Sequence, residues 1–299
     1  MPPSKPAPRP AVSVVVLGYN NQPYLEEALS SILAQKGAEF EVLFVDNASS
    51  DGSAEFVKKR FPQIRLISSP SNLGYAGGNN LGAREARGEY LVIVNPDVVA
   101  PAGWLSGLYK AAVSACRDSG AGSIFCSKVL LASDPSKINS TGVFLSKFGF
   151  CGSWGDGRPA GEFDAPLPLL APTGCSFIIS RGTFLGLGGF DEKFFMYAED
   201  LDLGWRAANR GIPTYLAPAS TLLHKYKSVG GRPAPYFQLS RNQLWAIRKN
   251  EKGPKKIMLL AASKVFYLSL SIAQLVFLRP AASLAIWKGL WAGFFTPIK

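Results

Sequence analysis

Hydrophobic and polar positions follow a repeating pattern through the first hundred residues. Four apolar runs have the length and β-branched composition of strands buried on both faces of a parallel sheet, and they span residues 12–17, 40–45, 64–67 and 90–94. Polar turns lead from these runs into amphipathic segments, the first of which opens at Pro23 and carries Leu25, Ala28, Leu29 and Ile32 on one face. The pattern predicts successive strand–helix units of an α/β protein.

The second half of the chain is less regular. We predict a helix over 104–116 and a strand over 122–130, whereas residues 133–168 are rich in Gly, Pro and Ser and predict an irregular excursion on the acceptor side. Order returns with a strand at 169–180, a helix beginning near Glu199 and a strand at 212–216.

The C-terminal segment is strongly apolar. Residues 257–278 are long enough to cross a bilayer, but Lys264 interrupts them, and Ser263, Tyr267, Ser271 and Gln274 lie on one helical stripe. Arg279-Pro280 breaks this helix, and 281–295 continues with Trp287, Lys288 and Trp291, which suit a headgroup boundary. We expect two helices in the membrane interface; two core helices that close the domain are the alternative.

These patterns predict three regions. Residues 1–10 are proline-rich, lack the apolar core of a signal peptide and predict a flexible, disordered leader. Residues 11–250 form the α/β domain, and 251–299 form amphipathic, membrane-associating helices.

The net charge indicates the class of binding partner, and the cysteines indicate the cellular compartment. The net charge of +11 favours anionic partners, and without helix-turn-helix, zinc-finger or RNA-binding motifs we expect nucleotide or membrane phosphates rather than nucleic acid. The cysteines form no CxxC pair or metal cluster, which indicates scattered, mostly buried thiols in a reducing compartment; they are Cys116, Cys126, Cys151 and Cys175. We therefore expect a cytoplasmic protein attached peripherally to the inner face of the cell membrane.

Two acidic residues end predicted strands. Asp46 and Asp97 follow the second and fourth strands at the carboxyl edge, where open α/β sheets bind ligands, so we expect them to be neighbours. Asp46 is suited to accept hydrogen bonds from a base or ribose, although a turn-forming role is possible. The glycines of 72–80 would let the backbone approach a ligand closely, and a purely structural glycine turn is the alternative.

Three carboxylates interrupt an aromatic and apolar stretch near residue 200. Glu199, Asp200 and Asp202 in such surroundings predict a raised pKa and a general base. A plain helix start, with Asp202 and Arg206 as an ion pair four residues apart, is the alternative. His224, the only histidine, follows a predicted strand and could contact metal or phosphate.

Several short motifs occur together in a specific order. They are Gly18-Tyr19-Asn20, Val45-Asp46-Asn47 through Ser53, Asn72-Leu73-Gly74 with Gly77 and Asn80, Asn95-Pro96-Asp97, Gly188-Gly189-Phe190-Asp191 and Glu199-Asp200-Leu201-Asp202. From residue 12 to 224 the chain resembles an inverting family 2 glycosyltransferase, most of all bacterial rhamnosyltransferases of surface-polysaccharide assembly. The first turn lacks GxGxxG and Walker patterns, which disfavours dinucleotide and P-loop folds.

The resemblance implies a GT-A fold, a single Rossmann-like and mostly parallel sheet flanked by helices, and it assigns roles to residues. Donor contacts would come from Tyr19, Asn20, Asp46, Asn72, Gly77, Asn80, Asn95 and Asp97. Asp200 would be the catalytic base, supported by Glu199, and Gly174, Cys175 and Glu199 would lie on the acceptor side, with Cys175 packing rather than reacting. Asp97 and His224 would bind Mg²⁺ or Mn²⁺, although Asn95 replaces the first acid of the family's DxD motif.

The implied reaction moves rhamnose or a related hexose, with inversion, from a dTDP- or UDP-sugar to a hydroxyl of a glycan or polyprenyl-linked acceptor. A membrane-associated protein that binds nucleotide sugars without turnover is the alternative.

Overall fold

The computed structural model describes residues 10–119, 122–225 and 235–298. The leader expected at 1–10 lies outside this range except for Pro10. In the described part, ten strands form one mixed sheet with the order β10-β12-β6-β11-β4-β1-β2-β3, with β5 paired to β12 and β7 to β6. Most neighbouring long strands are parallel, so the expected fold class is confirmed.

The N-terminal half of the sheet consists of parallel strands joined by helices. These are β1 (Val12–Gly18), β2 (Phe40–Asp46), β3 (Arg65–Ser68) and β4 (Tyr90–Val94), with α1 (Gln22–Leu33), α2 (Ser53–Arg60) and α3 (Gly74–Glu85) between them. Alternate residues of β1 face opposite layers: Val14 packs with α1 and α4 (Trp104–Ser119), and Val15 packs with α3. Burial on both faces explains the unbroken apolar runs.

The second half of the sheet brings the distant strand β12 (Thr214–His224) beside the N-terminal half. Strand β11 (Ser176–Ser180) lies antiparallel between β4 and β6 (Ile124–Leu131), and β12 is parallel to β6. The last residue of β12, His224, pairs with Val98 of the short strand β5 (Val98–Val99). This pairing places His224 next to Asp97.

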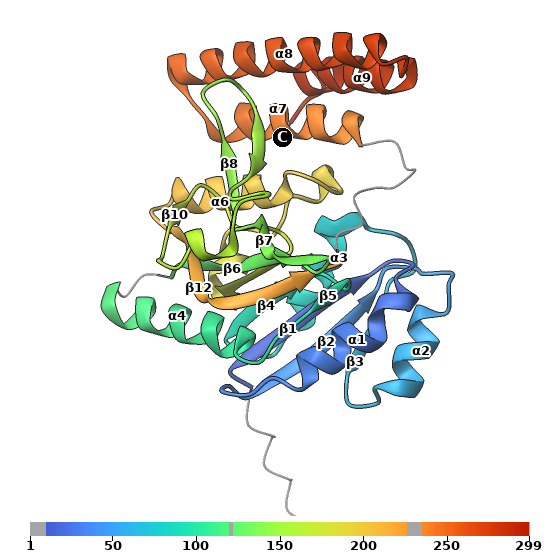
Figure 1. Cartoon of the computed structure of the whole chain (residues 1–299), viewed down its shortest axis with the longest axis vertical. Helices are drawn as coiled ribbons and strands as arrows, with labels where there is room; N and C mark the ends of the chain where they lie inside the picture. The colour runs from blue at the N-terminus through green and yellow to red at the C-terminus, as the bar shows by residue number, and fades with distance from the viewer. Residues whose placement is uncertain (1–9, 120–121, 226–234, 299) are drawn as a thin grey trace, which may run out of the picture.

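The irregular excursion expected at 133–168 is a wrong prediction, because this segment contains strands. It forms β7 (Asp134–Ser140), the hairpin β8 (Val143–Leu145) and β9 (Cys151–Ser153), the short helix η1 (Ala160–Glu162) and β10 (Pro168–Leu169). Strand β7 pairs with β6 and leaves most of its first residues in solvent, so it shows no apolar period. The β8–β9 hairpin rises from the sheet towards the C-terminal helices (Figure 1).

The glycine-rich stretch 72–80 is mostly helix rather than a turn. From Gly74 onward it is helix α3, and its glycines let the helix lie close to the sheet. A Cβ atom at Gly78 would come within 2.4 Å of Leu17, and one at Gly82 within 2.4 Å of Val15. Helix-to-sheet packing therefore accounts for these two glycines.

Helices cover both faces of the sheet. Helices α1, α2 and α4 lie on one face, and α3, α5 (Arg181–Gly186) and α6 (Glu199–Ala208) pack on the other, where the short helix η2 (Glu192–Phe194) precedes α6. Cys126 and Cys175 are buried as expected, Cys151 is half-buried and Cys116 is exposed; the structure leaves all four as free thiols.

Three helices form a further layer beyond α6: α7 (Tyr236–Asn250), α8 (Gly253–Val276) and α9 (Pro280–Phe295) (Figure 1). The polar stripe of α8 faces inward: Tyr267 donates to Gln243 Oε1 of α7 at 3.0 Å, and Ser271 Oγ lies 2.7 Å from Ser283 Oγ of α9. Apolar side chains face outward instead, including Val265 and Ile272, which are 64% and 63% exposed. This polarity is the reverse of that of a helix at a water-facing surface.

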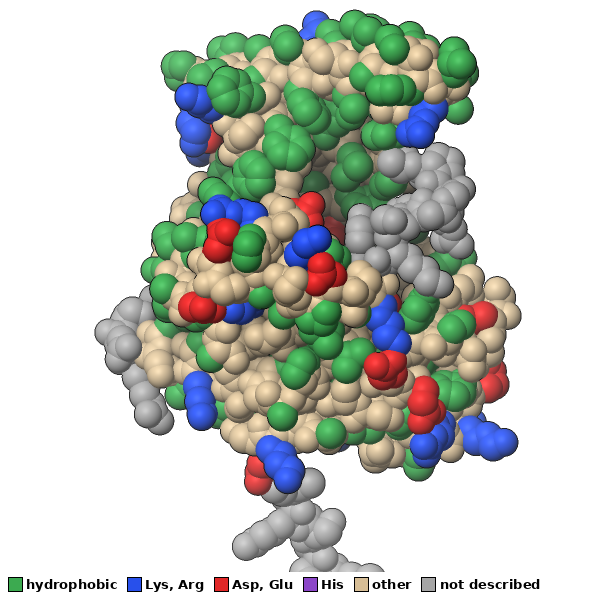
Figure 2. Space-filling model, viewed as in Figure 1, with side chains coloured by type: hydrophobic (Ala, Val, Ile, Leu, Met, Phe, Trp, Pro, Cys, Tyr) green, Lys and Arg blue, Asp and Glu red, His purple; other side chains and the backbone are tan. Residues whose placement is uncertain are grey.

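The outer face of this layer is a broad apolar surface. Figure 2 shows hydrophobic side chains gathered over α8 and α9 at one end of the molecule. Among the described residues, α8 alone has the length and apolar composition to cross a bilayer, which by itself is weak evidence for a membrane span. The two helices pack against the protein on one side, as the core-helix alternative predicts, and leave apolar side chains exposed on the other.

Candidate active site

A cleft of about 600 Å³ opens at the carboxyl ends of the parallel strands. The structure brings there residues from the ends of β1, β4 and β12, the turn before β11 and the start of α6. Of the predicted site residues, the cleft is lined by Tyr19, Asn72, Asn95, Asp97, Gly174, Cys175, Glu199, Asp200 and His224. Most of the separate motifs therefore meet at one site.

Asp200 is held at the cleft wall by two backbone N–H groups. Its Oδ2 accepts from Gly174 N at 3.0 Å and its Oδ1 from Leu201 N at 2.7 Å. Burial raises the pKa of Asp200, and these two hydrogen bonds oppose the shift by stabilising the ionised form. A carboxylate with a raised pKa and fixed orientation is suited to accept a proton from a substrate hydroxyl group.

Glu199 is more deeply buried than Asp200. Its side chain has an oxygen, Oε2, with no hydrogen-bond partner. Burial raises its pKa well above the ordinary value, and the adjacent Asp200 charge raises it further. The raised pKa values expected for these two acids are confirmed.

Asp202 does not reach the cleft and lies on the side of α6 that faces α7. The expected ion pair with Arg206 is present, with 2.7 Å between Asp202 Oδ2 and Arg206 Nε. Asp202 also accepts from Lys249 and Asn250 of α7, at 3.1 Å and 2.8 Å. Both interpretations of the acidic triplet therefore apply in part. Glu199 and Asp200 face the cleft, as expected for a general base, and Asp202 forms the helical ion pair that anchors α6.

Asp97 and His224 converge on the opposite side of the cleft. His224 Nε2 lies 3.2 Å from Asp97 Oδ1, and His224 Nδ1 lies 2.8 Å from the side-chain oxygen of Asn139 on β7. Burial alone would lower the pKa of the His224 imidazole, but Cys175 and Asp97 raise it to about 11. One carboxylate and one imidazole that point together fit a divalent ion that would displace the imidazole proton and take its other ligands from a diphosphate.

The described residues contain no group of three or more His, Cys, Asp or Glu side chains able to hold a metal ion by themselves. Asn95 lies in the cleft beside Asp97, and its backbone N–H donates to Cys175 O at 3.0 Å. The protein alone therefore offers fewer acidic ligands than a motif with two acids would.

A pair of asparagines forms the wall nearest β2. Asn47 Nδ2 donates to Asn72 Oδ1 at 3.0 Å and to Gly74 O at 3.1 Å, which ties the end of β2 to the start of α3. Asp46 is buried just behind this wall, where its Oδ1 has no partner and its Oδ2 is 3.4 Å from Ser49 N. Asn20 lies at the rim, and its Oδ1 accepts from Ser50 N at 2.8 Å. Asp46 and Asp97 end at the same edge of the sheet, with β1 between their strands.

Gly77 and Asn80 do not line this cleft. Asn80 donates to Phe190 O at 2.8 Å and accepts from Phe190 N at 2.9 Å, so its amide fixes the backbone of the Gly188–Asp191 motif. A Cβ at Gly77 would come within 2.8 Å of Leu73 Cβ, inside its own helix region. The structure therefore places both in the packing of α3, away from the donor-binding position expected from the sequence.

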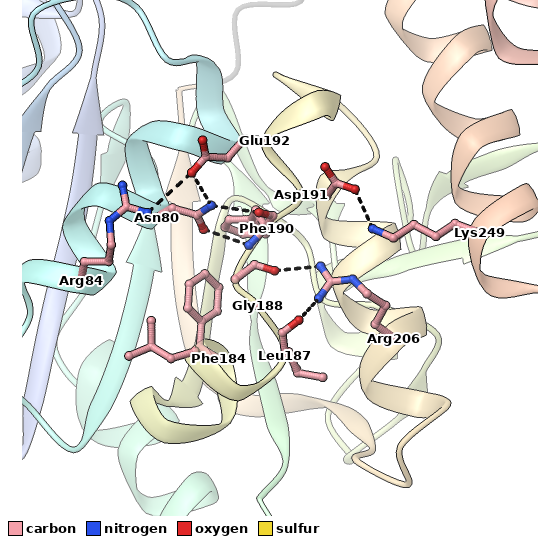
Figure 3. A pocket seen from close by; sticks show the side chains of 12 residues that line it. Asn80, Arg84, Phe184, Leu187, Gly188, Phe190, Asp191, Glu192, Arg206 and Lys249 are labelled. Carbon is pink, nitrogen blue, oxygen red and sulfur yellow. Dashed lines mark hydrogen bonds and ion pairs between the residues drawn. The ribbon is translucent and has the colours of Figure 1, made fainter. Parts of the chain in front are cut away.

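Asn80 lines a separate hollow on the far side of this motif. Figure 3 shows Lys249 pointing at Asp191 and Arg206 pointing at the backbone near Leu187. Lys249 Nζ lies 2.7 Å from Asp191 Oδ2, and Arg206 donates to Leu187 O at 2.7 Å. Both cationic side chains are paired with groups of the protein itself. We infer that Lys249 and Arg206 hold α6 and its preceding loop in place.

Some residues at the cleft were not assigned a role from the sequence. Tyr75 follows the Asn72-Leu73-Gly74 motif, and its hydroxyl donates to Gly174 O; burial raises the pKa of this phenol, as do Glu199 and Asp200. Asn47 adjoins Asp46 and could have been found by that position. No sequence pattern indicated Asn139 as a site residue, because it lies in the segment without an apolar period.

Comparison with known proteins agrees with this geometry. The model of the family "Glycosyl transferase family 2" matches residues 13–150. The N-acetylglucosaminyl-diphospho-decaprenol L-rhamnosyltransferase of Mycobacterium tuberculosis is 30% identical over 247 residues, which cover 75% of this chain and 79% of that protein.

Two solved structures share the fold. GalNAc-T7 with UDP, GalNAc and Mn²⁺ has a TM-score of 0.63 at 14% identity, covering 81% of this chain and 48% of that one, so this chain spans about half of its length. The mannosyltransferase PcManGT of Pyrobaculum calidifontis, in complex with GDP-Man and Mn²⁺, has a TM-score of 0.59 at 22% identity, covering 96% of this chain and 77% of that one.

The fold and the cleft define a GT-A glycosyltransferase that uses a nucleotide-sugar donor. The chain belongs to glycosyl transferase family 2.

Proposed function

We propose that this protein is an inverting, metal-dependent glycosyltransferase that moves rhamnose or a related hexose from a dTDP- or UDP-linked donor to a hydroxyl group of a polyprenyl-diphosphate-linked glycan. The observation that carries the proposal is Asp200, a half-buried carboxylate with a raised pKa that is fixed at the cleft by Gly174 N–H. The sugar and the acceptor class are supported by the relative from Mycobacterium tuberculosis.

In the proposed complex, the nucleoside lies against the Asn47–Asn72 wall, near Tyr19 and the buried Asp46. The unpartnered Asp46 Oδ1 can accept a hydrogen bond if a small rearrangement exposes it to the base or ribose. The diphosphate then lies beside Asp97 and His224 on the other side of the cleft. Asn20 shapes the rim through Ser50 and need not contact the donor.

In the proposed sugar transfer, the base lies on one side of the cleft and the leaving diphosphate on the other. Asp200 accepts the proton of the acceptor hydroxyl while the hydroxyl oxygen attacks the anomeric carbon, and the nucleoside diphosphate leaves from the opposite face of the sugar. One displacement inverts the anomeric centre. Gly174, Cys175 and Glu199 surround the acceptor hydroxyl, and His224 lies on the side of the leaving diphosphate. A bound Mg²⁺ or Mn²⁺ near Asp97 and His224 would supply Lewis-acid stabilisation of that charge.

Attachment to the inner face of the cell membrane completes the proposal. In α8 the polar stripe is used for contacts inside the protein, and the outward face of α8 and α9 is apolar, with Trp287 and Trp291 exposed. Apolar side chains of this kind insert shallowly, while the exposed Lys255, Arg279 and Lys288 meet anionic headgroups. A lipid-linked acceptor would then reach the cleft from the same membrane.

The decisive experiment offers the full-length protein a panel of dTDP-, UDP- and GDP-sugars with a polyprenyl-diphosphate-linked N-acetylglucosamine in anionic vesicles. We expect transfer from one dTDP- or UDP-sugar, and an inverted anomeric configuration in the product by NMR. A retained configuration would contradict the mechanism. Donor binding without transfer or hydrolysis would favour the non-catalytic alternative.

A further inference from the structure

The loop that precedes α6 has an unfavourable backbone. Phe195, Tyr197 and Ala198 have positive φ angles of 63°, 71° and 63°, a conformation that residues with a Cβ rarely adopt. The next two residues are Glu199 and Asp200. Strain of this kind persists only where surrounding groups hold it, so the loop requires partners that fix its shape.

One buried side chain of α7 supplies those contacts. The amide nitrogen of Asn242, which is fully buried, lies 2.9 Å from Phe194 O, 2.9 Å from Met196 O and 2.8 Å from Tyr197 O. Its oxygen accepts from Arg241 Nε at 2.8 Å, which orients the amide with its nitrogen towards the loop. A single NH₂ group thus lies within hydrogen-bond distance of three backbone carbonyl oxygens of the loop.

The opposite side of the loop is held by α3. Ala76 N donates to Phe195 O at 3.1 Å, and a Cβ at Gly74 would come within 2.4 Å of that same oxygen. The loop therefore lies between α3, whose start belongs to the cleft, and α7, whose other side carries the C-terminal helices. Asn242 is its buried side-chain anchor on the α7 side.

We propose that Asn242 is a positioning residue for the transfer reaction: its amide holds the strained loop so that α6 begins with Asp200 directed at the acceptor hydroxyl. The inference rests on the proposed role of Asp200 as base. Asn242 lines no part of the cleft and touches no substrate, so it acts only through the loop.

A second contact between the same two helices provides a control. Asn209, the residue that caps the C-terminal end of α6, donates one amide hydrogen bond to Asn250 O of α7 at 2.9 Å. It joins the same two helices as Asn242 does, but away from the strained loop. A general loss of contact between α6 and α7 would be reproduced by Asn209→Ala, whereas a loss of loop geometry would not.

The experiment compares Asn242→Ala, Asn242→Leu and Asn209→Ala in the full-length enzyme. We expect both Asn242 variants to lower kcat about 10- to 100-fold with the donor KM within about two-fold of wild type, as a small misplacement of a catalytic group does. Leu keeps the volume but has no donors, so a normal kcat in Asn242→Leu would overturn the proposal. Equal losses of kcat in Asn242→Ala and Asn209→Ala would overturn it as well.

Two further readouts separate positioning from simple destabilisation. Ala198→Gly accepts a positive φ without strain, so we expect it to restore part of kcat in Asn242→Ala and none in Asp200→Asn. Hydrogen exchange of residues 196–203 is expected to accelerate in Asn242→Ala and not in Asn209→Ala. If the wild-type protein transfers no sugar, the proposed function fails while hydrogen exchange still tests the anchor; unchanged exchange in Asn242→Ala would refute it.

Discussion

The Asp200 carboxylate and the backbone N–H of Gly174 are joined by a hydrogen bond of 3.0 Å, although 26 positions separate them in the chain. Gly174 lies in the turn before β11 and Asp200 in the first turn of α6, so the contact forms only when the sheet and α6 pack together. The bond orients one carboxylate oxygen and favours its ionised form.

The first prediction concerns this contact. A Cβ added at Gly174 would lie 3.3 Å from both Asp200 Oδ2 and Tyr75 Oη, so Gly174→Ala is expected to displace the carboxylate by a few tenths of an ångström. We expect kcat to fall about 10-fold or more while donor affinity, measured by calorimetry, stays near wild type. Gly182→Ala, at a glycine with open space around its Cβ position, is the control and should be neutral.

Removal of the proposed base is the second prediction. Asp200→Asn keeps the side-chain size but cannot accept the proton, so transfer should fall by about two to four orders of magnitude with donor binding intact. Glu199→Gln should cost less. Near wild-type transfer by Asp200→Asn would remove Asp200 from the mechanism, and loss of transfer in Glu199→Gln alone would reassign the role to Glu199.

The buried Glu199 also predicts a pH dependence of stability. Because its pKa is raised in the folded state, the folded protein binds this proton more tightly than the unfolded chain does. The free energy of unfolding should therefore fall as pH rises from the ordinary carboxylate range to the folded pKa, and level off above it. Glu199→Gln removes this loss, so its Tm should exceed that of wild type at about pH 8 and converge with it towards about pH 4. A Tm difference that is the same at both pH values would contradict this origin.

Metal use is the fourth prediction. Asp97 and His224 point together with 3.2 Å between their side-chain atoms, so Mn²⁺ or Mg²⁺ should bind tightly only when the nucleoside diphosphate is present. Calorimetry of Mn²⁺ with and without UDP or dTDP measures this, and His224→Ala should weaken the ternary complex. Full activity in excess chelator, or an unchanged metal response in His224→Ala, would contradict it.

The fifth prediction concerns the apolar face of α8. The double variant Val265→Ser/Ile272→Ser removes two side chains that are more than 60% exposed, so it should reduce flotation with anionic vesicles without lowering Tm. Leu185→Ser, at an apolar residue 38% exposed on α5, is the control and should float like wild type. If deletion of residues 251–299 left flotation of a still-folded protein unchanged, attachment through these helices would be wrong.

The local pattern of apolar and polar residues was sufficient to predict much of the structure of this protein. Strands buried on both faces appear as unbroken apolar runs, and their polar ends mark the ligand edge, so the strand–helix units, Asp97 and the acidic start of α6 were predictable from the sequence. The ion pair of Asp202 with Arg206 followed from helical spacing alone.

Other features depended on contacts between distant segments. The polar edge strand β7 has no apolar period because most of its first residues lie in solvent, and it supplies Asn139 to His224. The glycines of α3 could serve either a ligand or a close helix contact, and only packing against Val15 and Leu17 distinguishes the two. In the same way, Asn80 donates a hydrogen bond to the backbone of Phe190 and does not line the cleft.

The sequence by itself therefore determined the α/β class, the alternation of strands and helices in the first hundred residues and the residue types that carry the chemistry, because these depend on periodicity and on where strands end. Tertiary structure alone decided which polar side chains face the cleft and which hold the scaffold. A hydrogen bond such as that of Asn242 to the loop before Asp200 joins residues about 45 positions apart, and its direction depends on how α7 packs against α6. No local pattern encodes that direction.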